Sequence, residues 1–111
     1  MKAAWLLRDG EVLAALEVAE TREERMTGLL GRGGIDGAIL LRPARSVHSV
    51  GMAFTIDVAF CTKDLVVLRT VCLRPTRMTR PSLRGGCVIE AEIGAFERWK
   101  LHPGDQLEVR E

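Results

Sequence analysis

The sequence has no tyrosine, no net charge beyond a formal +1 and no apolar run of the roughly 18 residues that a membrane-spanning helix needs. The small net charge gives no overall attraction to nucleic acid or to an anionic membrane. Only five apolar residues separate Lys2 from Arg8, whereas a secretory leader needs about 7–15. The sequence therefore predicts a cytoplasmic chain.

Closely spaced cysteine and histidine pairs are also lacking, so no zinc site is predicted. Cys61, Cys72 and Cys87 are interpreted as free, mostly buried thiols, because cysteine packs as a small hydrophobic residue. A redox pair of Cys72 with Cys87 is the alternative. The sequence predicts no metal and no cofactor.

What the sequence does contain is apolar alternation that is typical of strands. "AAWLLRDGEVLAALEVAE" predicts a hairpin around Asp9-Gly10. Further strands are predicted at 38–42, 46–50, 54–61, 65–73, 87–93 and 106–110. The segment 65–73 is apolar on both faces, which indicates a central strand. Together these strands predict a single domain, residues 1–111, that folds as a mostly β, antiparallel β-sandwich or small barrel with one packed helix.

The helix is predicted at about residues 21–31. Thr21 and Glu24 fit a capping box, in which each side chain bonds the other residue's backbone N–H. An apolar stripe is expected to face the sheet, and it consists of Met26, Leu29 and Leu30.

Two carboxylates interrupt apolar strands. Asp57 and Glu90 each stand between aliphatic residues, where an unpaired charge is costly to bury. Arg25 lies one helical turn before Gly28, where a close approach of helix to sheet is expected. We therefore predict that Arg25 approaches Asp57 at one edge of the sheet, with Glu90 near them, as a structural or a ligand-binding group.

A hydrolase or a metal site is not favoured. His48 and Ser49 are adjacent on a predicted strand, so their side chains point to opposite faces, and no G-x-S-x-G elbow is present. A metal site of His48, Asp57 and His102 lacks a spacing signature. The one basic run is a loop of arginines that suits solvent or an anion, and it has no aromatic residue for stacking on nucleic acid. Its members are Arg74, Arg77, Arg80 and Arg84.

Four stretches resemble the prokaryotic domain-of-unknown-function family numbered 192. They are "RMTGLLGR", "FTIDVAF", "VIEAEIG" and "LHPGDQL". The matching positions are Arg25, Gly28, Leu29 and Arg32 in the first, Asp57, Ala59 and Phe60 in the second, Glu90 and Gly94 in the third, and Leu101, Gly104 and Asp105 in the fourth. The order and spacing of the four matches together carry the resemblance.

The resemblance implies a mostly β fold. It points to no particular biochemical activity. It also implies that many relatives carry secretory or lipoprotein leaders, and none is visible in this sequence. At residues 47–52 the chain has "VHSVGM" where the family often has F-W-M-K-N-T. His48 and Ser49 thus fall in a variable segment, whereas Asp57 and Glu90 belong to the shared framework.

The leading functional hypothesis is a small binding or accessory domain for a peptide segment or a small anion. The candidate binding residues are Arg25, Arg32, His48, Ser49, Asp57 and Glu90. One alternative is a hydrolase or lyase that uses Asp57 or Glu90 as general base with His48 as acid. A second alternative is a weak nucleic-acid binder that uses the loop from Arg74 to Arg84.

Overall fold

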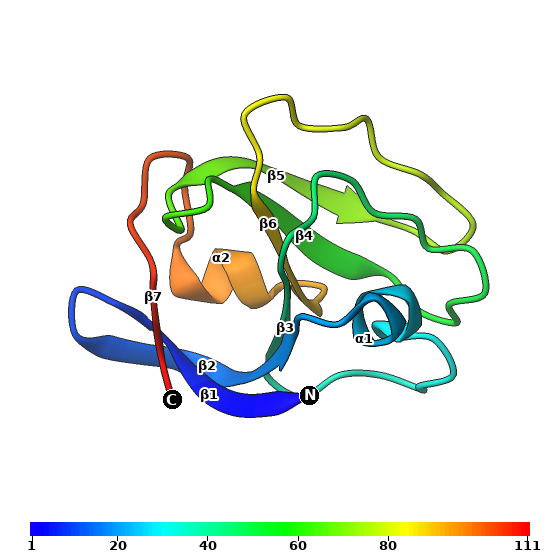
Figure 1. Ribbon diagram of the computed structural model, residues 1–111, viewed down its shortest axis with the longest axis horizontal. Helices are drawn as coiled ribbons and strands as arrows, with labels where there is room; N and C mark the ends of the chain where they lie inside the picture. Colours follow the sequence, from blue (N-terminus) through cyan, green and yellow to red (C-terminus); the bar gives the residue numbers. More distant parts are fainter.

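The computed structural model describes residues 1–111, which form one seven-stranded sheet with two short helices (Figure 1). The elements are β1 (Lys2–Arg8), β2 (Glu11–Ala19), α1 (Arg22–Thr27), β3 (Ala38–Leu41), β4 (Ile56–Cys61), β5 (Val67–Leu73), β6 (Cys87–Glu92), α2 (Ala95–Trp99) and β7 (Glu108–Arg110). The strand order is β5-β4-β6-β3-β2-β1-β7. The prediction of a mostly β fold is confirmed.

The sheet is open but strongly bent, which gives it a sandwich-like shape. The β1–β2 hairpin lies below α2 in Figure 1, β5 lies above it, and β6 runs down beside it. The segment before β7 reaches back to the start of β5. The amide of Leu107 donates to the carbonyl of Leu65, and that of Val67 donates to Asp105, both over 2.9 Å. These bonds bring the two ends of the sheet together without closing a barrel.

The predicted antiparallel pairing holds for every neighbouring strand pair except β2 and β3, so the sheet is mixed. β2 and β3 run parallel, with Leu16 opposite Ala38. Parallel neighbours need a crossover connection, because a tight turn reverses the chain. Residues 20–37 provide this crossover, and α1 lies within it. The crossover therefore sets the position of α1 over one face of the sheet.

Two strand predictions also need correction. Residues 46–50 form no strand, and their single bridge pairs His48 with Met78 of a neighbouring loop. The predicted central strand at 65–73 is β5, which lies at an edge of the sheet. Four of its residues are half-buried, and one of them, Arg69, reaches across to β4, where its guanidinium lies 4.3 Å from the ring centre of Phe60. The apolar content of a segment does not by itself distinguish a packed edge strand from a central strand.

The helix α1 is shorter than predicted. The capping box of Thr21 and Glu24 is present, but the helix ends at Thr27 because Gly28 has φ +45° and ψ −120°. Such a backbone conformation is open to glycine and costly for other residues. Leu29 is buried, whereas Met26 and Leu30 are 65% and 37% exposed. Of the three residues of the predicted apolar stripe, only Leu29 packs against the sheet, and Met26 and Leu30 face solvent.

Two hydrophobic clusters lie on opposite faces of the sheet. Alternation along β4 divides them, because successive side chains point to opposite faces. Ala59 belongs to the cluster around α2 and Phe96, and Phe60 belongs to the cluster around Leu29. One face is covered by α2, and the other by Leu29 and the loops around it, because no residue of α1 itself is buried. No helix of the structure is long and apolar enough to cross a membrane.

The three cysteines are free. Cys61 and Cys87 are buried and directly opposite in the β4–β6 ladder, whereas Cys72 is exposed and opposite Asp57. Cys72 is on β5 and Cys87 is on β6, and β4 lies between these two strands. The alternative prediction, a redox pair of Cys72 with Cys87, was therefore wrong. Contact with Cys87 and burial raise the pKa of the Cys61 thiol.

Gly37 tests the crossover geometry. It has φ +79°, and a Cβ there would stand 2.4 Å from the carbonyl oxygen of Ala15 on β2. Gly31 has the same φ of +79° with open space around it. We expect Gly31→Ala to lower the free energy of unfolding by about 1–2 kcal/mol and Gly37→Ala by about a further 1–3 kcal/mol. Urea unfolding measures both, and equal losses would contradict the close approach.

Candidate functional site

Glu90 lies in the middle of β6 with no partner in the protein. It is opposite Val58 of β4 and Ile39 of β3, so its side chain points to the α1 face of the sheet. The residue is 3% exposed, and no backbone or side-chain group donates a hydrogen bond to its carboxyl group. Burial alone raises the pKa of Glu90 to about 7. An acid that is held this way is half ionised near neutral pH.

The carboxyl group of Glu90 lines a small pocket of about 80 Å³. The walls come from the end of α1 and the residues that follow it, from β3, and from the loop that leads towards β4. The lining residues are Arg25, Met26, Thr27, Gly28, Leu29, Leu30, Leu41, Ser46, Val47, His48, Met52 and Glu90. A mostly apolar pocket with a few polar groups is the usual form of a small-ligand site.

Gly28 keeps the space beside the carboxyl group open. A Cβ at this position would stand 3.9 Å from Oε1 of Glu90. The chain reverses at Gly28, so the backbone rather than a side chain faces the acid. Glycine at this position therefore serves both the helix end and the pocket.

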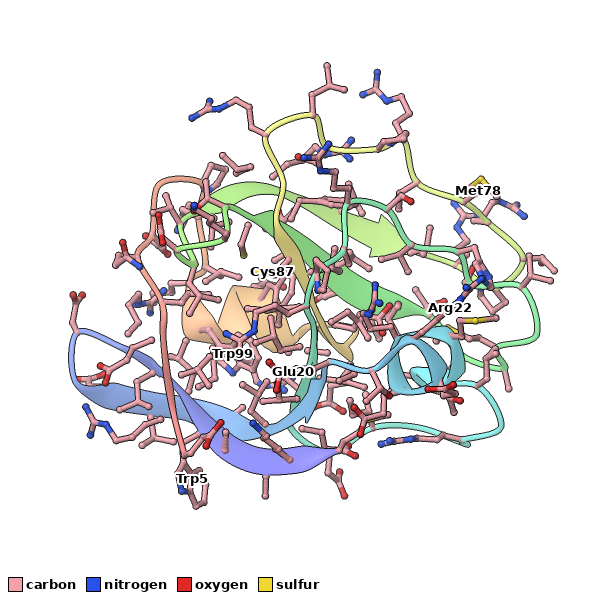
Figure 2. All side chains as sticks on the ribbon, viewed as in Figure 1. Trp5, Glu20, Arg22, Met78, Cys87 and Trp99 are labelled. Atoms are coloured by element: carbon pink, nitrogen blue, oxygen red, sulfur yellow. The ribbon has the colours of Figure 1, made fainter.

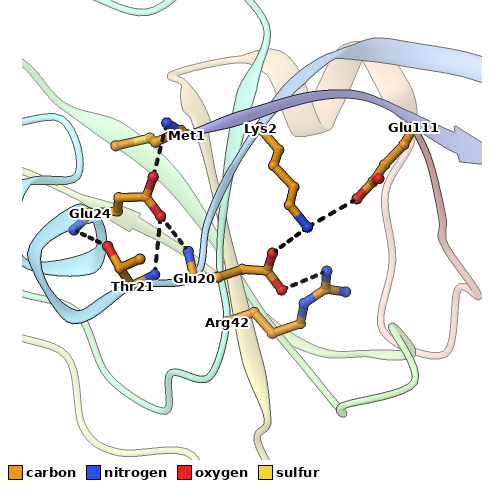
Figure 3. Close-up of polar contacts among 7 residues, drawn as sticks. All are labelled: Met1, Lys2, Glu20, Thr21, Glu24, Arg42 and Glu111. Atoms are coloured by element: carbon orange, nitrogen blue, oxygen red, sulfur yellow. Dashed lines mark hydrogen bonds and ion pairs between the residues drawn. The ribbon is translucent and has the colours of Figure 1, made fainter.

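Polar contacts fix α1 over this face. The carboxylate of Glu24 accepts hydrogen bonds from the amides of Glu20 and Thr21, over 3.1 and 3.0 Å (Figure 3). It also pairs with the amino group of Met1 over 2.9 Å. Arg42, directly after β3, pairs with Glu20 over 3.4 Å. These contacts tie the start of the helix to β1, β2 and β3, and so hold the pocket wall.

Arg25 forms the polar side of the pocket. Its Nη1 donates to the carbonyl of Pro43 over 2.9 Å, and its Nε is buried without any hydrogen-bond partner. Leaving a buried donor unpaired costs about 1–3 kcal/mol. The pocket wall thus contains one donor and one acceptor that the protein itself does not satisfy, at Arg25 and at Glu90.

His48 and Ser49 have different roles. His48 is exposed at the pocket rim, where its backbone bridges to Met78. Ser49 is fully buried, its Oγ accepts from the amide of Arg77 over 2.8 Å, and its hydroxyl donates to the carbonyl of Arg74. Ser49 therefore joins two loops and is not open to a ligand.

Asp57 does not approach Arg25 or Glu90, so that part of the predicted group was wrong. It is opposite Ala91 in the β4–β6 ladder, one residue out of step with Glu90, and hence points to the other face. There its Oδ2 accepts from the amides of Gly94 and Phe96 over 3.0 and 3.2 Å. The residue that caps α2 is a glycine without a side chain. A carboxylate from a neighbouring strand takes over the capping.

The other candidates lie away from the pocket. Arg32 forms a two-bond ion pair with Glu17 of β2, over 2.6 and 2.9 Å, and this bonding lowers the pKa of Glu17. The Nδ1 of His102 lies 2.7 Å from the carbonyl of Lys100. The side chains of Arg74, Arg80 and Arg84 have no partner in the protein. The sequence did not single out Ser46 and Met52 as pocket residues; the only signal for them was that Met52 lies in the variable segment and Ser46 directly before it.

These features define a class, a mostly β protein with an open mixed sheet and a buried carboxyl group in a pocket. The chain belongs to the family DUF192, described as "Uncharacterized ACR, COG1430", which it matches over residues 5–109. A UPF0127 protein of Pyrococcus abyssi is 28% identical over an alignment of 98 residues, and the match covers 84% of this chain and 84% of that relative.

Two solved structures have a similar fold. A protein of unknown function from Novosphingobium aromaticivorans has a TM-score of 0.76 and 17% identity, and the match covers 96% of this chain and 83% of that one. A protein from Sinorhizobium meliloti 1021, described as a "putative transcription regulator", has a TM-score of 0.79 and 21% identity, and the match covers 96% and 92%. At these identities the likeness shows the fold alone.

The role of Asp57 predicts a loss of stability without a loss of the pocket. Asp57→Ala leaves the amides of Gly94 and Phe96 without an acceptor. We expect the free energy of unfolding to fall by about 1–2 kcal/mol, as for the loss of a helix cap. Urea unfolding measures the change, and Asp64→Ala in an exposed turn is the control. A loss no larger than that of the control would refute the capping role.

The raised pKa of Glu90 predicts a pH dependence. An acid whose pKa rises from 4.5 to about 7 on folding costs stability when it ionises. Stability relative to Glu90→Gln should therefore fall as the pH rises from 4.5 to about 7, by about 3 kcal/mol in all, and level off above that. Urea unfolding across this range measures it, with exposed Glu97→Gln as the control. A wild-type profile parallel to that of Glu90→Gln would contradict the unpaired carboxyl group.

Proposed function

We propose that the chain is a binding module whose pocket takes an amide group of a peptide or small molecule. The observation that carries this proposal is the carboxyl group of Glu90, which is 3% exposed and has no partner in the protein. An amide offers an N–H donor for Glu90 and a carbonyl acceptor for the guanidinium of Arg25. The apolar walls suit the carbon atoms that flank the amide.

A free anion fits the inner pocket less well than an amide does. Two carboxylates at close range repel each other, and burial strengthens the repulsion. A small anion, the other predicted ligand, would therefore bind at the rim beside Arg25 rather than at the pocket floor beside Glu90. The volume of the pocket also favours a single amide. About 80 Å³ holds the end of a side chain or one amide and not a whole peptide.

Acetamide and acetate are matched in shape and test this preference at pH 8. We expect acetamide to shift the amide resonances of Gly28, Leu29 and His48 in ¹H–¹⁵N spectra, and acetate to leave them unchanged. Glu90→Leu removes a hydrogen bond to a charged group, so it should weaken acetamide binding about tenfold or more. Glu97→Leu, at an exposed position, is the control. Acetate that binds the pocket as tightly as acetamide would refute the proposal.

A second candidate function is an enzyme in which Glu90 is the general base and His48 the acid. Its support is the pKa of Glu90 at about 7, which suits proton transfer near neutral pH, with His48 at the same pocket. Asp57 is a weaker base candidate, because α2 already uses its oxygen. Screening ester, phosphoester and glycoside substrates tests this candidate. Turnover that Glu90→Gln abolishes, with folding intact, would favour the enzyme over the binding module.

We also propose that the chain acts in the cytoplasm. Its three cysteines are free, and disulfide-free cysteine use is typical of reducing compartments. Fractionation of cells that produce the native protein tests this location, and recovery in the periplasmic or secreted fraction would contradict it.

A further inference from the structure

Charge is unevenly distributed along the chain. Residues 37–90 contain eight Lys and Arg residues and three Asp and Glu residues, although the whole chain is at +1. Two of these three acids have roles away from the surface charge, because Asp57 caps α2 and Glu90 is buried. The loops of this part of the chain therefore form a basic face. Nitrogen-tipped side chains point outward from the loop between β5 and β6 in Figure 2.

The arginines divide into paired and unpaired groups. Five are held in ion pairs with carboxylates, namely Arg8, Arg32, Arg42, Arg98 and Arg110. The side chains of Arg22, Arg45, Lys63 and Arg84 have neither an ion pair nor a hydrogen bond in the protein. These four cations are available to a partner.

These four cations line two hollows, the first of which adjoins the Glu90 pocket and the second of which adjoins the first. The first, of about 440 Å³, contains Arg22 and Arg45 and shares Arg25 and His48 with the pocket. The second, of about 460 Å³, is lined by the three cations Arg45, Lys63 and Arg84 and by one acid, Asp64, so its charged side chains are mostly basic. It shares Pro43, Ala44 and Arg45 with the first. We call these two hollows together the basic groove. It follows the chain after β3 and leads to the pocket.

We infer that the basic groove binds an acidic peptide segment of a partner, whose carboxylates pair with Arg45, Lys63 and Arg84. Guanidinium groups bind carboxylates with two parallel hydrogen bonds, and unpaired surface cations supply the attraction. At the pocket end the segment would insert one amide beside Glu90, and this detail rests on the proposed function above.

A peptide suits the groove better than a nucleic acid does. No Phe, Tyr or Trp lines the groove or the pocket, and the one ring among the lining residues is the imidazole of His48. Single-stranded nucleic acid is usually bound by stacking its bases on aromatic side chains. The pocket acceptor at Glu90 also repels a phosphate, whereas a peptide carries both the acids for the groove and the amide for the pocket.

Fluorescence anisotropy with labelled short peptides tests the inference. One peptide has glutamates on both sides of a central asparagine, a second replaces the glutamates by glutamines, and a third replaces the asparagine by leucine. We expect the acidic peptides to bind more tightly than the glutamine peptide, with affinity that falls as salt rises. The double variant Arg45→Glu/Arg84→Glu should weaken acidic-peptide binding at least tenfold, while Arg98→Glu/Lys100→Glu, matched in charge and remote from the groove, should not.

The outcomes separate the groove from the pocket. Equal binding of the acidic and glutamine peptides, or equal losses in the two double variants, would overturn the groove. Oligothymidylate that binds more tightly than the acidic peptides would assign the groove to nucleic acid and overturn the peptide. The asparagine and leucine peptides, compared in wild type and in Glu90→Leu, report on the pocket alone. If they bind equally while the acid preference remains, the pocket proposal fails and the groove stands.

Discussion

The buried carboxyl group of Glu90 is the constraint around which the α1 face of the sheet is arranged. A carboxylate in an apolar cluster is costly unless hydrogen bonds or an opposite charge offset its lost hydration. Here neither is supplied, and Gly28 and the bend after α1 leave space at the carboxyl group instead of filling it. A leucine at this position would avoid the cost of burying an unpaired acid. The arrangement therefore favours a site that an external group completes over a purely structural acid.

The two framework carboxylates show how a strand period of two residues separates roles. Asp57 and Glu90 both interrupt apolar strands, and both are on neighbouring strands of one ladder. Their registers differ by one residue, so Asp57 faces α2 and caps it through one carboxylate oxygen. Glu90 faces α1 and has no partner. Of two carboxylates, one thus stabilises a helix and the other is left unpaired, because of geometry alone.

Local features were predictable from the sequence. The hairpin at Asp9-Gly10 and the capping box of Thr21 and Glu24 formed as expected, since both depend on neighbours along the chain. The parallel pairing of β2 with β3 and the edge position of β5 were not, because strand pairing depends on contacts between distant segments. The same holds for the candidate site. The sequence identified Glu90 as an acid that is costly to bury. Its position on the opposite face from Asp57 depended on the β4–β6 register, which the sequence did not predict.

The central claim is that the carboxyl group of Glu90 is buried without a protein partner and is completed by a ligand. The most direct measurement is an NMR titration of the side-chain carboxyl carbon of Glu90, without and with saturating acetamide. We expect a pKa of about 7 in the free protein and a lower pKa with acetamide, because an N–H donor stabilises the ionised form. A pKa near 4.5 in the free protein, or one that acetamide leaves unchanged, would contradict this claim.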